Sequence, residues 1–146
     1  MISTKWIQGN KGLEGVHAIR RKVFIEEQGV SEALELDGTD ALCIHLLVFK
    51  NNIPVATGRI FMDGNKCMLG RVAVLKERRK QKYGKLVMKM LIRASYNMGA
   101  DMQYVHAQAQ ASDFYKKLGF ISYGNPFLEA NIYHISMVHE GNWEGE

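Results

Sequence analysis

The segment between residues 69 and 86 constrains the fold of this chain more than any other. Its first six residues form an apolar run typical of a strand, which continues through a short basic turn into an amphipathic helix expected at residues 79–98. A helix N-terminus presents unpaired backbone N–H groups and a partial positive charge, so it can bind a phosphate. Six cations surround this one: Lys76, Arg78, Arg79, Lys80, Lys82 and Lys85. The segment predicts a pyrophosphate site, although most basic runs are only a solvated helix surface.

Length and composition indicate one globular domain, residues 1–146, with a polar tail at 141–146 that we expect to be frayed. The net charge of +4 favours an anionic partner without specifying which. The two cysteines, Cys43 and Cys67, lie in apolar runs without metal-ligand spacing, which indicates buried reduced thiols and no metal site. No apolar run reaches membrane-spanning length and no signal peptide is recognisable, so we expect a cytoplasmic protein without a membrane partner.

Hydrophobic periodicity predicts a mixed α/β (α+β) fold, in which helices pack on a single sheet. We expect strands at residues 2–8, 42–49, 53–62, 67–74, 102–107, 120–123 and 132–138, the last two around a break at residues 124–126. We expect helices at residues 13–28, 79–98 and 111–118. Residues 31–40 are expected to form an acidic loop, with one helical turn in it left open. Arg20 falls largely outside the apolar face of the first helix. The strand at 102–107 follows a helix, so it should run parallel to its predecessor.

Two motifs, in this order, resemble the GNAT acetyltransferase superfamily. Arg79 and Gly84 match the first and last positions of its acetyl-CoA motif, Arg/Gln-x-x-Gly-x-Gly/Ala, while Lys82 stands where the first glycine is expected. Residues 111–120, Ala-Ser-Asp-Phe-Tyr-Lys-Lys-Leu-Gly-Phe, resemble the family segment Ala-x-x-Phe-Tyr-x-x-x-Gly-Phe. The segment that contains residues 21–28 and ends at Gln28 is similar to the Arg-x-x-Val-Phe-x-x-Glu-Gln helix end of the ElaA-like branch. That branch, like the related glyphosate N-acetyltransferases, carries Arg-x-x-Lys-x-Gly.

The resemblance covers nearly the whole chain and implies the GNAT fold. That fold has a mixed, mostly antiparallel central sheet of about six to seven strands, which is flanked by helices and splayed at the acetyl-CoA site. It also implies acetyl-CoA as co-substrate, with the pyrophosphate on backbone N–H groups at the helix start and the pantetheine arm along the preceding strand. The cofactor-binding candidates are Arg71, Val72, Ala73, Val74, Arg79, Lys80, Gln81, Lys82, Tyr83, Gly84, Lys85, Gln108, Ser112 and Tyr115. Whether the Lys82 side chain contacts phosphate stays open.

Acetyl transfer requires a neutral amine, a stabilised oxyanion and a proton for the leaving thiolate. Tyr115 matches the family's general acid; the alternative is a core tyrosine beside Phe114. His134 aligns with the histidine that acts as base in glyphosate N-acetyltransferase; the alternative is a structural strand histidine. Further candidates for proton removal through water are Glu26, Glu27 and His45, and a chain of waters without a single base is also open.

Acceptor recognition is expected in the loop at residues 26–40 and on the strand of His134. The substrate-binding candidates are Arg20, Glu26, Glu27, Gln28 and His45. The acidic residues favour a cationic amine, whereas Arg20 and Arg71 favour a carboxylate-bearing acceptor. The main hypothesis is an acetyl-CoA-dependent N-acetyltransferase acting on a primary amine of a small molecule by direct attack. The alternatives are a CoA-binding sensor with little turnover and, on thin support, a basic nucleic-acid-binding module. Dimers are frequent in the superfamily, so a homodimer is a further expectation.

Overall fold

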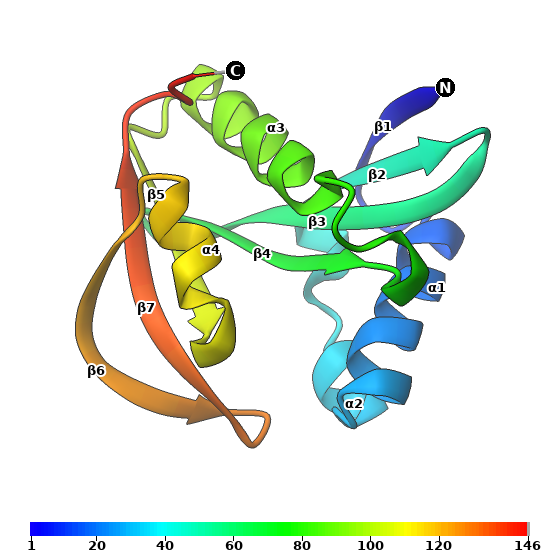
Figure 1. Cartoon of the computed structure of the whole chain (residues 1–146), viewed down its shortest axis with the longest axis horizontal. Coiled ribbons are helices and arrows are strands. Elements are labelled where there is room, and N and C mark those ends of the chain that lie inside the picture. The colour runs from blue at the N-terminus through cyan, green and yellow to red at the C-terminus, as the bar shows by residue number, and fades with distance from the viewer. Residues whose placement is uncertain (146) are drawn as a thin grey trace.

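The computed structural model, which describes residues 1–145, has one seven-stranded sheet with helices on both faces (Figure 1). The strands are β1 (Ile2–Gln8), β2 (Ile44–Lys50), β3 (Ile53–Asp63), β4 (Lys66–Val74), β5 (Met102–Gln108), β6 (Ile121–Glu129) and β7 (Ile132–Glu140). They lie in the order β1-β2-β3-β4-β5-β7-β6, and every neighbouring pair is antiparallel except β4 and β5. The expected mixed, mostly antiparallel sheet is confirmed.

Four α-helices and several shorter turns connect the strands. The α-helices are α1 (Glu14–Arg20), α2 (Glu32–Glu35), α3 (Tyr83–Asn97) and α4 (Ser112–Lys117). Helix α1 continues as a π-helical stretch, η1 (Arg21–Glu27), and three 3₁₀ turns are η2 (Thr39–Leu42), η3 (Lys76–Arg78) and η4 (Ala109–Ala111). Among the described residues, none of these helices has the length and apolar character needed to cross a membrane.

Two local expectations, the start of the long helix and the end of the sixth strand, require correction. The long helix begins at Tyr83 rather than Arg79, because Lys80 and Lys82 adopt left-handed backbone conformations that a helix cannot contain. The acidic segment at residues 31–40 contains α2, a single helical turn that the sequence pattern left open, and the start of η2. The strand expected to stop at residue 123 continues to Glu129, because a shift in its pairing with β7 absorbs residues 124–126.

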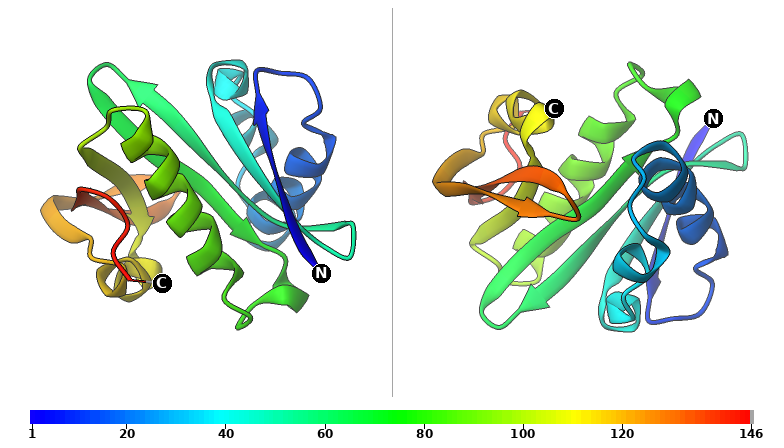
Figure 2. Two further views of the ribbon diagram at one scale, coloured as in Figure 1. Left: turned by 90° about the horizontal axis from the view of Figure 1, so that it is seen from above. Right: turned by 90° about the horizontal axis from the view of Figure 1, so that it is seen from below.

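Separate apolar clusters pack α1 and α3 against opposite faces of the sheet (Figure 2). On one face Val16 and Ile19 of α1 contact the sheet; on the other, Val87 and Leu91 of α3 do so. Gly58 of β3 permits the close approach of α3, because a Cβ there would lie 2.6 Å from Val87 Cγ1. The long helix that carries the basic turn is thereby fixed on the centre of the sheet.

Strands β4 and β5 pair over two positions only, Cys67 with Gln103 and Met68 with Tyr104. Beyond these positions β4 continues to Val74 and β5 to Gln108, but the two strands no longer pair with each other and therefore separate. Arg71 and Val72 bulge on β4, where these two residues oppose the single residue Gly58 of β3. The expected separation of the strands therefore lies beside residues 71–72, whose backbone groups interrupt the regular hydrogen bonding between β4 and β3.

The C-terminal segment contacts the core at one residue. Trp143, within the tail expected to be frayed, packs against the cluster that covers the α3 face. Glu146, the last residue of that tail, lies outside the described residues.

Candidate active site

The basic turn and the start of α3 line a pocket of about 400 Å³. Lys82 caps the helix with φ 69°, and Lys80 before it has φ 64°. The lining residues are Val74, Arg78, Arg79, Lys80, Lys82, Tyr83, Gly84, Lys85 and Phe114. Gly84 lies against α4, since a Cβ there would be in van der Waals contact with the Phe114 ring at 3.4 Å. The pocket therefore combines unpaired helix N–H groups with exposed cations, as an anion site requires.

Arg79 is already engaged by a carboxylate. Its two terminal nitrogens donate to the Glu27 carboxylate at 2.6 and 2.7 Å, and its Nε donates to Val74 O at 3.1 Å. The hydrogen bonds from Arg79 lower the pKa of Glu27 below its usual value. Glu27 was expected among the acceptor-binding residues and Arg79 among the cofactor-binding ones; the fold joins them, and the pair holds η1 beside the basic turn. Glu26, the next residue along η1, is exposed.

Tyr115 lies on α4 between two aromatic rings. Its ring meets Phe114 and Phe120 edge-on, with centroid distances of 5.0 and 5.6 Å. Burial raises the pKa of the phenol to about 12, so the hydroxyl stays protonated in neutral solution. Within residues 1–145, no group hydrogen-bonds to this hydroxyl. Phe114, the preceding residue of α4, lines the basic pocket, whereas the hydroxyl of Tyr115 keeps a proton that no described group accepts.

The end of β5 is joined to η1 by a pair of amides. Gln108 Nε2 donates to Gln28 Oε1 at 2.8 Å, and Gln28 Nε2 donates to Gln108 Oε1 at 3.3 Å. Gln110 donates to the same Gln108 oxygen at 2.6 Å. Two predicted site residues far apart in sequence are thus in contact. Ser112, the remaining cofactor candidate outside the basic turn and β4, is the first residue of α4.

His134 lies on β7 directly opposite Gln108 and is almost fully buried. Its Nδ1 is 2.7 Å from Ile132 O, and its Nε2 is 3.7 Å from Glu129 Oε2. Sequence reasoning missed Glu129. Ala130 and Asn131 form a tight turn with positive φ, and recognising that turn would have placed residue 129 on the strand paired with β7.

Arg20 and His45 are buried away from the surface. Arg20 is 1% exposed, and its guanidinium donates to the Glu35 carboxylate, to Glu35 O at 2.9 Å and to Asp40 Oδ1 at 2.7 Å. His45 is 0% exposed, with Nε2 3.0 Å from Asp40 O. Their positions give no support to direct contact with an acceptor. The helical pattern placed Arg20 off the apolar face, but carboxylates from α2 and η2 cover it.

Arg71 connects this buried network to the bulge in β4. Its Nε lies 3.0 Å from Glu35 Oε2, and Nη2 donates to Leu34 O and Glu35 O at 3.3 and 3.4 Å. Burial lowers the pKa of its guanidinium, although Glu35 opposes that effect. The side chain is committed to α2, which leaves the backbone of residues 71–74 as the part of β4 available to a cofactor.

Asp40, Cys43 and His45 lie within 4.8 Å of one another, a spacing compatible with a metal ion. However, Arg20 and Arg59 donate to the same Asp40 oxygen, at 2.7 and 2.9 Å. Two guanidinium groups on the only carboxylate would repel a cation, so this group is part of an ion-pair network.

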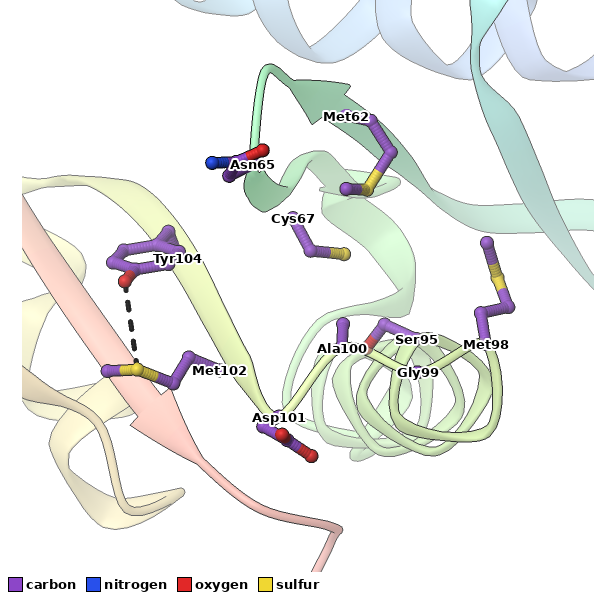
Figure 3. A pocket seen from close by; sticks show the side chains of 10 residues that line it. All are labelled: Met62, Asn65, Cys67, Ser95, Met98, Gly99, Ala100, Asp101, Met102 and Tyr104. Carbon is purple, nitrogen blue, oxygen red and sulfur yellow. Dashed lines mark hydrogen bonds between the residues drawn. The ribbon is translucent and has the colours of Figure 1, made fainter.

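A second cavity, of about 460 Å³, lies at the paired end of β4 and β5 (Figure 3). Its walls include the sulfur-bearing residues Met62, Cys67, Met98 and Met102, and Tyr104 donates to Met102 Sδ at 3.8 Å. Although it is the larger cavity, it shares no lining residue with the basic pocket. Burial also raises the pKa of Cys67, which disfavours a reactive thiolate there.

Comparison with known proteins assigns the chain to a family. Residues 11–140 match the family described as Acetyltransferase (GNAT) domain. Bacillus subtilis YyaT is 42% identical over 142 residues, which cover 95% of this chain and 96% of YyaT. The uncharacterized N-acetyltransferase YjcF of the same organism is 35% identical over 127 residues, covering 86% of this chain and 91% of YjcF.

Among solved structures, Escherichia coli ElaA superposes with a TM-score of 0.85 at 28% identity, covering 96% of this chain and 100% of ElaA. The chain therefore belongs to the GNAT acetyltransferase family. The expected resemblance to the ElaA-like branch is confirmed, and with it the GNAT fold. The family uses acetyl-CoA.

Proposed function

We propose that this protein is an acetyl-CoA-dependent N-acetyltransferase that acetylates a primary amine of a small molecule. The observation that carries this proposal is the protonated hydroxyl of Tyr115, to which no group among residues 1–145 hydrogen-bonds. Tyr115 lies on α4, which packs against β5 and whose Phe114 lines the basic pocket. A sensor that only binds CoA needs the pocket but not the acid. The names of relatives such as YjcF agree with acetyl transfer.

Acetyl-CoA would enter with its pyrophosphate on the N–H groups at the start of α3. Lys80, Lys82 and Lys85 supply positive charge around it, and Gly84 keeps the approach open. The pantetheine arm would lie along residues 71–74, which have no partner on the β5 side. Backbone N–H groups at the Arg71–Val72 bulge are candidates for stabilising the oxyanion, because the bulge takes them out of the ladder with β3.

The chemistry is direct attack by the neutral amine on the thioester carbonyl. The C–N bond forms, the C–S bond breaks, and the departing thiolate takes the proton of Tyr115. His134 is the candidate base, because its ring is fixed through Nδ1 and its Nε2 has no hydrogen-bond partner among residues 1–145. Glu26 is exposed and Glu27 is paired with Arg79, so either would act only through water.

The test is release of free CoA thiol from acetyl-CoA in the presence of a panel of primary amines. We expect amine-dependent turnover in the wild type and a fall of about 100-fold in kcat for Tyr115→Phe. Tyr96→Phe, at a half-exposed position on α3, is the matched control and should retain full activity. Tight acetyl-CoA binding without turnover for any amine would instead indicate a CoA sensor.

A further inference from the structure

The imidazole of His134 has a fixed proton position. A carbonyl oxygen only accepts hydrogen bonds, so the contact of 2.7 Å with Ile132 O requires the hydrogen on Nδ1. In the neutral ring Nε2 then carries a lone pair. The residue is 6% exposed, and within the described part of the chain Nε2 has no hydrogen-bond donor. A buried acceptor of this kind is costly unless a ligand or water satisfies it.

A second hydrogen-bond acceptor, the Glu129 carboxylate, lies near His134 Nε2. Glu129 Oε2 lies 3.7 Å from His134 Nε2, and Glu129 Oε1 lies 3.6 Å from His106 Nδ1. Both separations exceed hydrogen-bond length, so the carboxylate is held between two imidazoles without bonding to either. Phe127 stacks on His134 at 5.8 Å and meets His106 edge-on at 5.0 Å, which closes one side of the group. Glu129 remains about half exposed, so a solute can reach it.

Glu129 is ionised in neutral solution. The His106 imidazole beside it lowers the pKa of its carboxyl against the opposing effect of burial, and Arg71 contributes in the same direction. The position therefore offers one carboxylate and one imidazole lone pair, with a gap between them. The complement of that pair is a compact group with several N–H donors and a positive charge.

The pair lies on β6 and β7, next to the end of β5 that separates from β4. His134 is opposite Gln108, the last residue of β5, whose amide is bonded to Gln28 after η1. The β6–β7 hairpin extends along one side of this region, and α1 and α2 flank the other (Figure 1). Arg71, in the β4 bulge, is close enough to influence Glu129 electrostatically.

We propose that Glu129 and His134 together bind the ammonium group of the acceptor, so that the acceptor is a cationic primary amine. This inference rests on the proposed function and specifies its substrate class. A nitrogen about 2.9 Å from both Glu129 Oε2 and His134 Nε2 bridges their separation of 3.7 Å. Glu129 is the binding residue, and His134 is the base.

The proton balance follows from this arrangement. His134 Nε2 takes one proton from the ammonium, and the resulting imidazolium pairs with Glu129. The neutral amine forms the C–N bond as the C–S bond breaks, and Tyr115 protonates the thiolate. The second nitrogen proton, released as the amide forms, restores Tyr115 through water. The overall change converts an ammonium ion and a thioester to an amide, a thiol and one proton, without another reactant.

The binding test uses two probes of similar shape and opposite charge, n-butylammonium and butyrate, each titrated to about 50 mM into the CoA-loaded protein. Imidazole ¹⁵N signals report the occupancy. We expect n-butylammonium, but not butyrate, to shift the His134 Nε2 resonance, and the affinity to fall at least about 10-fold in Glu129→Gln. Glu140→Gln, at an exposed site on β7, is the matched control and should bind as the wild type does.

A response to butyrate alone, or an equal n-butylammonium response in Glu129→Gln, would overturn the inference. Because Glu129 is half exposed, the variant should fold, and an unchanged cooperative melt verifies it. Acetyl-CoA binding and turnover are measured separately. If the wild type does not bind acetyl-CoA, the proposed function is refuted. If the wild type turns over acetyl-CoA and Glu129→Gln changes neither n-butylammonium binding nor turnover, only the ammonium site is refuted.

Discussion

The burial of Tyr115 determines how readily its hydroxyl can give up a proton. Packing between Phe114 and Phe120 raises the pKa of its phenol to about 12, above the usual value for tyrosine, because the charged form is poorly solvated. A thiol has an ordinary pKa of about 8.5, so such a phenol does not protonate a thiolate favourably by itself. The transfer is expected to be coupled to the proton that the new amide releases.

For Tyr115→Phe we expect acetyl-CoA affinity to stay within about 2-fold of the wild type while kcat falls about 100-fold. The raised pKa keeps the phenol protonated until the pH approaches about 12. At pH values up to about 10, deprotonation of Tyr115 should therefore not lower the wild-type rate. Rates over this pH range and acetyl-CoA titrations measure both effects. A loss of wild-type rate at high pH, centred near pH 8 and absent from Tyr115→Phe, would contradict this account.

Lys82 departs from the glycine of the family motif, yet its backbone adopts the conformation that glycine favours, with φ 69°. Lys82→Gly should therefore preserve the turn and remove only the charged side chain. We expect the free energy of unfolding to change by less than about 1 kcal/mol, and calorimetric titration with acetyl-CoA then measures the side chain's contribution to binding. An unchanged dissociation constant would mean that Lys82 serves through its backbone alone. Unfolding of the variant would contradict this reading of the turn.

The residue-level predictions rest on motifs that are encoded locally. Gly84 and the aromatic pair Phe114–Tyr115 were identified because their motif spacing fixes them relative to one helix start. The burial of Arg20 could not be predicted, because the carboxylates that cover it come from Glu35 and Asp40, well along the chain. The partner of His134 was missed for a similar reason, since Glu129 reaches it across a hairpin.

At the scale of elements, buried ion pairs hold α2 against α1 and the bulge in β4, and hold η2 against α1 and β3. Asp40 accepts from Arg20 at 2.7 Å and Arg59 at 2.9 Å, and lies 2.9 Å from His17 Nε2. Burial alone would raise the pKa of Asp40, but Arg20, and then His17 and Arg59, outweigh it and hold that pKa well below its usual range. Its ionisation therefore stabilises the fold above about pH 4, and that stabilisation is lost as the pH falls further.

Asp40→Asn should lower the free energy of unfolding by about 3 kcal/mol at neutral pH, because it leaves Arg20 and Arg59 short of a buried counter-charge. Urea unfolding of the wild type and the variant measures the difference, and it should shrink as the pH drops below about 4. Asp63→Asn, at an exposed end of β3, is the control. A variant as stable as the control at neutral pH would show that the network is not a determinant of stability.

Periodicity located every strand and the three main helices, because apolar spacing reports which face is buried. It failed at boundaries set by backbone conformation. The left-handed residues Lys80 and Lys82 delay the start of α3, and an irregular pairing carries β6 through Pro126. Neither feature changes the hydrophobic pattern, so neither was predictable from it.

At the scale of the whole molecule, the net charge of +4 is partly concentrated around one pocket. We expect acetyl-CoA to bind several-fold more weakly when NaCl is raised from about 0.05 M to about 0.5 M, because exposed cations are screened over a few ångströms at the higher concentration. Calorimetric titration at both concentrations measures this effect. Dephospho-CoA, with fewer charges, should show a smaller change. Equal affinity at both salt concentrations would argue against the basic turn as the phosphate site.

The central claim is that the separated strands and the basic turn form an acetyl-CoA site, and the melting temperature with and without acetyl-CoA tests it most directly. A ligand at about 100 times its dissociation constant adds about 2.7 kcal/mol to stability, which corresponds to a rise of several degrees for a chain of this size. We expect that rise in the wild type and in Tyr115→Phe alike. An unchanged melting temperature at millimolar acetyl-CoA would contradict the account.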